Sequence, residues 1–166
     1  MLNWLKNRYL INNEMNALDL KKGLYTEVSR LLTEKIRVAE TAMQAAQASA
    51  NEETKSSAGD KYETGRAMAQ NDRDMYARQF LQLKQEMQTV DFAFQAASSE
   101  VVSAGSLVGT SLGWIWIAVS IGHVKWMDTS AMVVSAASPI GQAIWHKKEG
   151  ETFVFRNQTH QITTLL

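Results

Sequence analysis

The sequence predicts an α+β protein, in which an N-terminal antiparallel α-helical coiled-coil hairpin precedes a small antiparallel sheet domain with one short helix. Two observations predict this layout. Two long segments carry apolar residues at alternating spacings of four and three, the pattern of a coiled-coil seam. After residue 97 the chain changes to short β-prone runs separated by Gly and Ser, which is typical of strands and turns. The expected parts are an N-terminal extension (1–15), the hairpin (16–97) and the sheet domain (98–166).

The first arm of the expected hairpin starts at about Asn16. Between the seam positions lie mostly polar residues, and toward residue 50 the seam shrinks to alanine. Gly23 disfavours helix, so we expect the helix to bend or to start there. The seam positions are Leu20, Leu24, Val28, Leu31, Leu32, Ile36, Ala39, Met43 and Ala46.

The second arm runs from about Asp60 to Ala97, and its seam also becomes small and polar toward the tip of the hairpin. Such matched tapering favours a hairpin that pairs with itself in a monomer, with a tip at about 47–66. A compact helical bundle and a coil that dimerises between chains remain alternatives. From the base toward the tip, its seam positions are Phe94, Val90, Met87, Leu83, Phe80, Tyr76, Arg73, Ala69, Arg66 and Tyr62.

The second half predicts strands near 101–108, 114–121 and 131–135, and a closing hairpin of 152–156 with 160–165. In the middle strand, Trp114 and Trp116 alternate with apolar residues that face the other way, so we expect this strand to be covered on both faces. A short helix should start after Ser138, because Ser is favoured as an N-cap and Pro at the first helical position.

Composition limits the function classes. The 17 basic and 17 acidic residues give zero net charge, which argues against direct nucleic-acid binding through phosphate neutralisation. The absence of cysteine excludes a thiol nucleophile, a disulfide framework and a Cys-ligated zinc site. No apolar run approaches the roughly 18–20 residues of a membrane span. We therefore expect a cytoplasmic protein without membrane contact. For residues 1–14, a short amphipathic helix and an extension before a natural start at Met15 are both open.

The tip carries the one site-like group of residues. Asp60 and Glu63 stand three apart, on one face if the second helix has begun there. Together they could hold Mg²⁺, which prefers oxygen ligands, and could complete a two-metal site in a polymerase centre. The alternative is that they are first-turn acids that complement the helix dipole. The full set of tip candidates is Asp60, Glu63, Glu52 and Glu53.

Other signatures are weak. GSLVGTSLG lacks the Gly-Lys-Ser/Thr of a phosphate loop, and the three histidines are dispersed without metal-ligand spacing. A ligand cage formed by Trp114, Trp116 and Trp126 is weighed against a role for these tryptophans in the core. No nucleophile–base pair is visible, so an autonomous enzyme is not expected.

Residues 131–156, AMVVSAASPIGQAIWHKKEGETFVFR, and the final NQTHQITTLL resemble the Gre family of bacterial transcript cleavage factors. With the hairpin, the resemblance covers roughly residues 16–166. It implies an FKBP-like C-terminal domain that docks on RNA polymerase at the rim of its secondary channel, while the hairpin enters that channel. It makes Ser138, Pro139, Ile140 and Gly141 candidate polymerase contacts, although these residues also suit a helix cap. It implies no cofactor in the free protein and Mg²⁺ shared only within the complex.

The tip departs from the family pattern, in which two acids precede Asn-Ala-Glu-Tyr. Anchoring on Tyr62 places Lys55 and Ala58 at the acid positions, and cleavage chemistry would be lost. A shifted register places Asp60 and Glu63 at the two acid positions, but the Asn-Ala-Glu-Tyr pattern is then absent. The expected function is therefore a polymerase-binding regulator of elongation or cleavage that lacks cleavage activity if the first register holds. The alternatives are an FKBP-like prolyl isomerase or chaperone with a helical arm, and a structural coiled-coil interaction protein.

Overall fold

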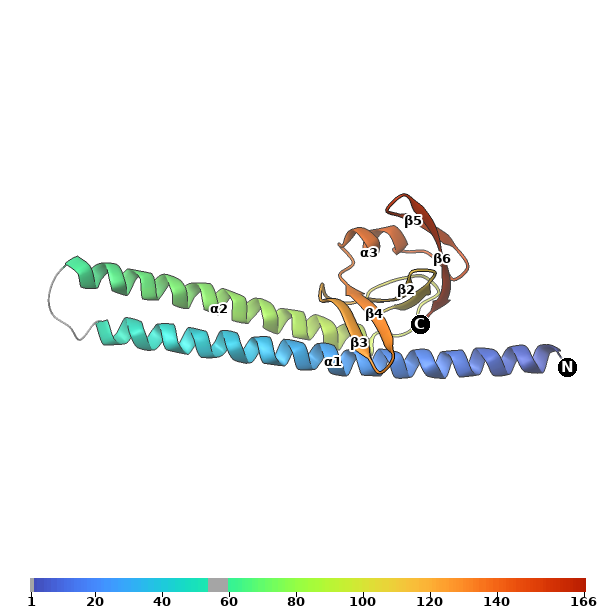
Figure 1. Cartoon of the computed structure of the whole chain (residues 1–166), viewed down its shortest axis with the longest axis horizontal. Helices are drawn as coiled ribbons and strands as arrows, with labels where there is room; N and C mark the ends of the chain where they lie inside the picture. Colours follow the sequence, from blue (N-terminus) through green and yellow to red (C-terminus); the bar gives the residue numbers. More distant parts are fainter. Residues whose placement is uncertain (1, 54–59) are drawn as a thin grey trace. The chain divides into compact units, whose positions relative to one another are not determined.

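The fold comes from a computed structural model, which describes the backbone of residues 2–53 and 60–166 and the side chains of residues 17–52 and 63–166. Two long helices precede a six-stranded sheet with one short helix, so the predicted α+β layout is confirmed (Figure 1). In chain order the elements are α1 Leu2–Glu53, α2 Asp60–Gln95, β1 Leu107–Thr110, β2 Gly113–Ile117, β3 Gly122–Trp126, β4 Thr129–Val134, α3 Pro139–Ile144, β5 Thr152–Phe155 and β6 Gln158–Leu165.

The chain divides into two compact units. One contains Met1–Ser29 and Gln88–Leu166, and the other contains Arg30–Met87. The long helices pass through both units, and α2 with its 36 residues is about 54 Å long at 1.5 Å per residue. The boundaries expected from the sequence, at residues 15 and 97, stay predictions.

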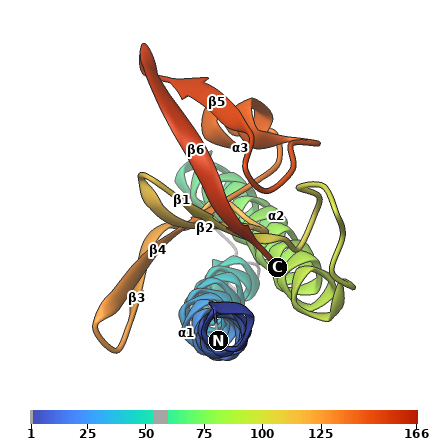
Figure 2. The ribbon, with the colours of Figure 1, turned by 90° about the vertical axis from the view of Figure 1, so that its right-hand side faces the viewer.

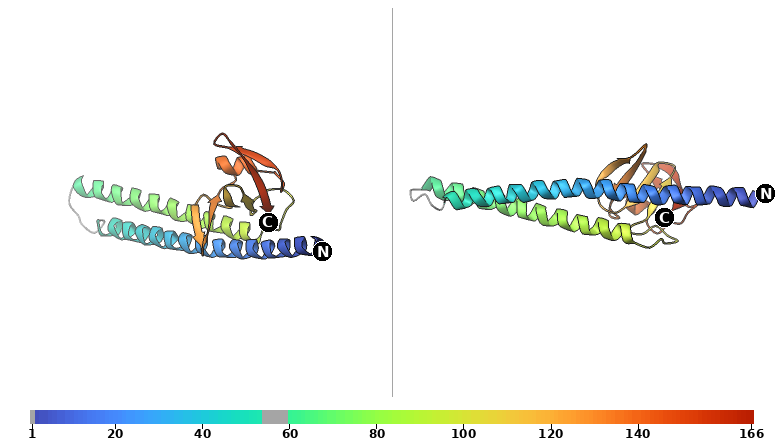
Figure 3. Two further views of the ribbon diagram at one scale, coloured as in Figure 1. Left: turned by 45° about the vertical axis from the view of Figure 1, so that its right-hand side comes forward. Right: turned by 90° about the horizontal axis from the view of Figure 1, so that it is seen from below.

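The unit Arg30–Met87 is an antiparallel pair of helical segments, which lie side by side in Figure 1 and in the left view of Figure 3. Gln47 of α1 reaches Arg73 of α2, whereas Val38 and Ala39 line a hollow with Tyr76 and Gln79. Later residues of α1 therefore face earlier residues of α2, as expected for antiparallel helices. Ala39 and Leu83, which the seam pattern placed between the arms, are buried.

In the other unit, α1 and α2 are joined by an aromatic contact. The rings of Tyr25 and Phe94 stack with centroids 4.2 Å apart, and the Tyr25 hydroxyl donates a hydrogen bond of 2.9 Å to Asp91. Helix α1 is unbroken through Gly23, so the expected bend or start there is wrong. A side chain at this position would overlap the indole ring of Trp126, which explains the glycine.

The sheet has the strand order β3-β4-β2-β1-β6-β5. Four of its pairings are antiparallel, as predicted, but β2 and β4 pair in parallel, which corrects the purely antiparallel expectation. The parallel pair arises because β3 lies between β2 and β4 in the sequence. After Ile117 the chain forms β3 at the edge of the sheet, and β4 then returns antiparallel to β3 and lies between β3 and β2. Strand β3 was not predicted, and the segment expected to be one strand over 114–121 ends at Ile117.

The first predicted strand, 101–108, is mostly loop. Val102 is fully buried, but its backbone bonds to the segment after α3: its N–H donates to Lys147 and its carbonyl accepts from His146. The β-prone composition therefore reflects burial rather than strand pairing. The closing hairpin is confirmed as β5 and β6, joined by Arg156 and Asn157, both at positive φ.

The two faces of the sheet are covered differently. One face carries Ile115 and Ile117 in a core with Ile140 and Ile144 of α3, and α3 lies beside β5 (Figure 2). The opposite face carries Trp126, which packs on Gly23 of α1. Strand β2 is thus interior and buried on both sides, as its apolar alternation predicted.

Candidate functional site

The predicted acidic tip is only partly described. Glu52 and Glu63 are exposed to solvent. Glu53 ends α1 and Asp60 begins α2, but their side chains, like residues 54–59 with Lys55 and Ala58, lie outside the described residues. The start of α2 puts Asp60 and Glu63 in its first turn, three residues apart on one helix face. Both interpretations of these acids, a shared magnesium ion and a complement to the helix dipole, therefore stay predictions.

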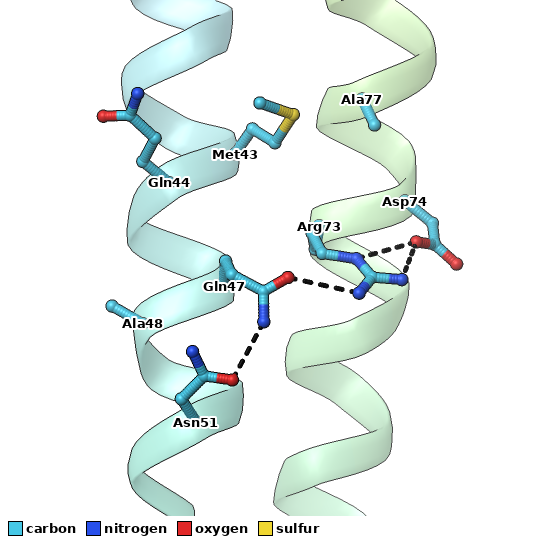
Figure 4. A pocket seen from close by; sticks show the side chains of 8 residues that line it. All are labelled: Met43, Gln44, Gln47, Ala48, Asn51, Arg73, Asp74 and Ala77. Carbon is cyan, nitrogen blue, oxygen red and sulfur yellow. Dashed lines mark hydrogen bonds and ion pairs between the residues drawn. The ribbon is translucent and has the colours of Figure 1, made fainter.

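Next to the tip, a chain of hydrogen bonds crosses between the long helices (Figure 4). The Gln47 amide donates to Asn51 at 3.0 Å, and its oxygen accepts from the Arg73 guanidinium at 3.2 Å. The same guanidinium donates to Asp74 at 3.0 and 2.6 Å. Arg73 occupies a seam position, in the part of the seam that the sequence predicted to be small and polar. Polar residues at seam positions fix which residues of the two helices face each other. These hydrogen bonds therefore select the register of α1 against α2.

These residues also surround a hollow of about 640 Å³ between the two helices (Figure 4). Met43 and Ala77 form its apolar part, and the hydrogen-bonded groups form its polar part. Four of the polar side chains, Gln47, Asn51, Arg73 and Asp74, are already hydrogen-bonded to one another, which leaves the hollow few free hydrogen-bonding groups for a ligand.

The candidate polymerase contacts around α3 have local structural roles. Ser138 is the N-cap of α3, and its hydroxyl accepts a hydrogen bond of 3.0 Å from the Gly141 amide. Ile140 is buried in the core. A side chain at Gly141 would overlap the carbonyl of Ser135. Pro139 is exposed and therefore remains the member of this set that is accessible to a partner.

The three tryptophans weighed as a ligand cage share one face of the sheet but do not form an open cage. The strand register places Trp114, Trp116 and Trp126 on one face, but Trp116 is fully buried, and only Trp114 and Trp126 keep partial exposure. Phe153 belongs to the core of the opposite face. The open aromatic cleft that a prolyl isomerase would need from these four residues is therefore not formed.

Sequence reasoning missed a cavity in the unit that contains the sheet. It lies between the first part of α1, the end of α2 with residues 96–100, and the end of β6, with a volume of about 780 Å³. Lys21 lines it and is buried, with 6% of its surface exposed. The signal was present: Lys21 lies four residues after Ala17 and three before Leu24, at the spacing of buried seam residues.

No protein-family model matches the chain, and no curated protein matches it. Within the described parts of the chain, no helix is long and apolar enough to cross a membrane. Over the same residues, no group of three or more His, Asp or Glu side chains could hold a metal ion.

Proposed function

We propose that this protein is a Gre-type regulator that binds RNA polymerase near its secondary channel and modulates transcript elongation or cleavage. The observation that supports it best is the order of elements. Two long helices, antiparallel between Arg30 and Met87, precede a small sheet domain in which a Ser-Pro-capped helix packs on the sheet. This is the order that the resemblance to the Gre family implies, and α3 lies in the segment where the resemblance is strongest.

Under this proposal the protein has no active site of its own. Its tip would act inside the polymerase, and the tip sequence decides how. With Lys55 and Ala58 at the two acid positions, the factor would occupy the channel without inducing cleavage. If Asp60 and Glu63 serve instead, they would hold a magnesium ion jointly with the polymerase, because carboxylates are the ligands that this ion prefers.

Binding to core RNA polymerase from the same organism tests the proposal. We expect the full chain to be retained by immobilised polymerase at micromolar concentration. A complete lack of retention would refute the proposal. A transcript-cleavage assay on backtracked complexes then separates the two tip readings: stimulation that is lost in Asp60→Asn with Glu63→Gln assigns the chemistry to these acids. Stimulation that survives in the double variant clears them of this role.

No observation favours the prolyl isomerase alternative, because the aromatic residues that would form its cleft are divided between two faces of the sheet. A helical module that dimerises between chains is tested by light scattering. The antiparallel pairing of α1 with α2 within one chain leads us to expect a monomer.

A further inference from the structure

Lys21 is a buried cation that faces a cavity. Only 6% of its surface is exposed, although Lys is among the residues least often buried without a partner. Among the residues that the structure describes, it has neither a hydrogen-bond nor an ion-pair partner. Burial lowers the pKa of the Lys21 amine, since desolvation disfavours its charged form. The partial desolvation of this amine therefore carries an energetic cost, which no described side chain offsets.

The surroundings of Lys21 define what could offset this cost. The cavity walls next to it are mainly apolar and include Leu18, Phe94 and Leu165. Phe94 is held in place by its stacking on Tyr25, so this wall is preformed. Ser98 adds a hydroxyl at the edge. One cation, a hydroxyl and a rigid apolar wall form the usual composition of a small-molecule site, and about 780 Å³ is within the usual size range.

The charge of the site selects the type of anion. Lys21 supplies a single positive charge, and Glu100, the one acidic side chain that lines the cavity, is exposed at its rim. A group with two or more negative charges, such as a phosphate, would be repelled by Glu100 and only partly compensated by Lys21. We propose that this cavity binds a monocarboxylate with an apolar body, whose carboxylate pairs with the Lys21 ammonium and whose body covers Phe94 and Leu165.

The test uses the full-length protein and hexanoate as the probe, titrated by NMR. Hexanamide, which has the same shape without the charge, and inorganic phosphate serve as comparison ligands. Lys21→Met keeps the length of the side chain and removes its charge. Lys22→Met is the matched control, because Lys22 is the next residue of α1 and is exposed.

We expect hexanoate to bind saturably and about tenfold or more tightly than hexanamide, as a charge-assisted hydrogen bond implies. Lys21→Met should lose this preference, and Lys22→Met should keep it within about twofold, since exposed charges contribute little. Equal hexanoate binding by Lys21→Met and the wild type would overturn the proposal. Tighter binding of phosphate than of hexanoate would overturn the assignment to a monocarboxylate, and so would the absence of saturable hexanoate binding.

A second measurement does not depend on any variant. A carboxylate next to a buried ammonium favours its charged form, so hexanoate should raise the pKa of Lys21 in the wild-type protein. The side-chain NMR signal of Lys21, followed against pH with and without hexanoate, measures this change. A pKa that stays the same at saturating hexanoate would contradict the proposed ion pair.

Discussion

Gly23 is the position where the structure makes its sharpest prediction about stability. In a helix interior, Gly→Ala ordinarily stabilises by about 0.8–1.0 kcal/mol, because alanine has the higher helix propensity. Here the new methyl group would overlap three atoms of the Trp126 indole. The ring would have to withdraw by more than about 1 Å to reach ordinary contact at about 3.5 Å. Such overpacking costs about 1–3 kcal/mol. After subtraction of the propensity gain, we expect Gly23→Ala to lower the free energy of unfolding by up to about 2 kcal/mol.

Urea denaturation followed by circular dichroism measures this change, and a second background provides the control. In Trp126→Ala the obstructing ring is absent, so Gly23→Ala should stabilise by about 1 kcal/mol. The sign of the effect thus reverses between the two backgrounds. Stabilisation by Gly23→Ala in the wild type as well would refute the packing of Trp126 on α1.

Three further changes test other contacts. Tyr25→Phe should lower the free energy of unfolding by about 0.5–1.5 kcal/mol, because it removes the hydrogen bond to Asp91. That bond raises the pKa of Tyr25, so the wild type should lose this advantage as the pH rises above about 10, which urea titrations at several pH values would detect. Gln47→Ala removes one hydrogen bond from the partly exposed Arg73 and should cost about 0.5–1 kcal/mol by urea denaturation. Ser138→Ala removes the N-cap of α3 and should cost about 1 kcal/mol, while polymerase binding stays unchanged if the role of this serine is structural.

The long helices could be predicted because their seam pattern repeats over many turns. Leu24, Val28, Leu83 and Val90 all occupy buried positions, as their spacing indicated. The reason for a glycine at position 23 could not be predicted, since the side chain that packs on it, Trp126, lies about 100 residues away in the sequence. Local propensity alone disfavours helix there, and a tertiary contact decides the outcome.

The sheet was predicted in outline, but the prediction missed strand β3. Strand β3 escaped prediction because His123 and Lys125 are polar and exposed on an edge strand, which leaves Val124 as its buried residue. Its turn into β4 uses Met127 at positive φ, where a glycine or asparagine would have given a recognisable signal. Without β3, the parallel pairing of β2 with β4 could not be foreseen.

For the sites, sequence reasoning identified the polar seam residue Arg73 and did not single out Lys21. Both residues lie at positions whose spacing predicts burial. Arg73 has found partners across the helix pair, whereas Lys21 has none among the described residues. A lysine at a seam position is therefore the signal that could have pointed to the cavity.

Site-specific photo-crosslinking to core RNA polymerase tests the proposed function most directly. Met68 of α2 and Val154 of β5 are exposed, at 63% and 65%, so each accepts a photoreactive residue without disturbing the core. We predict that position 68 crosslinks to polymerase segments inside the secondary channel and position 154 to its rim. Adducts outside the channel from position 68, or no adduct from either position, would contradict the proposal.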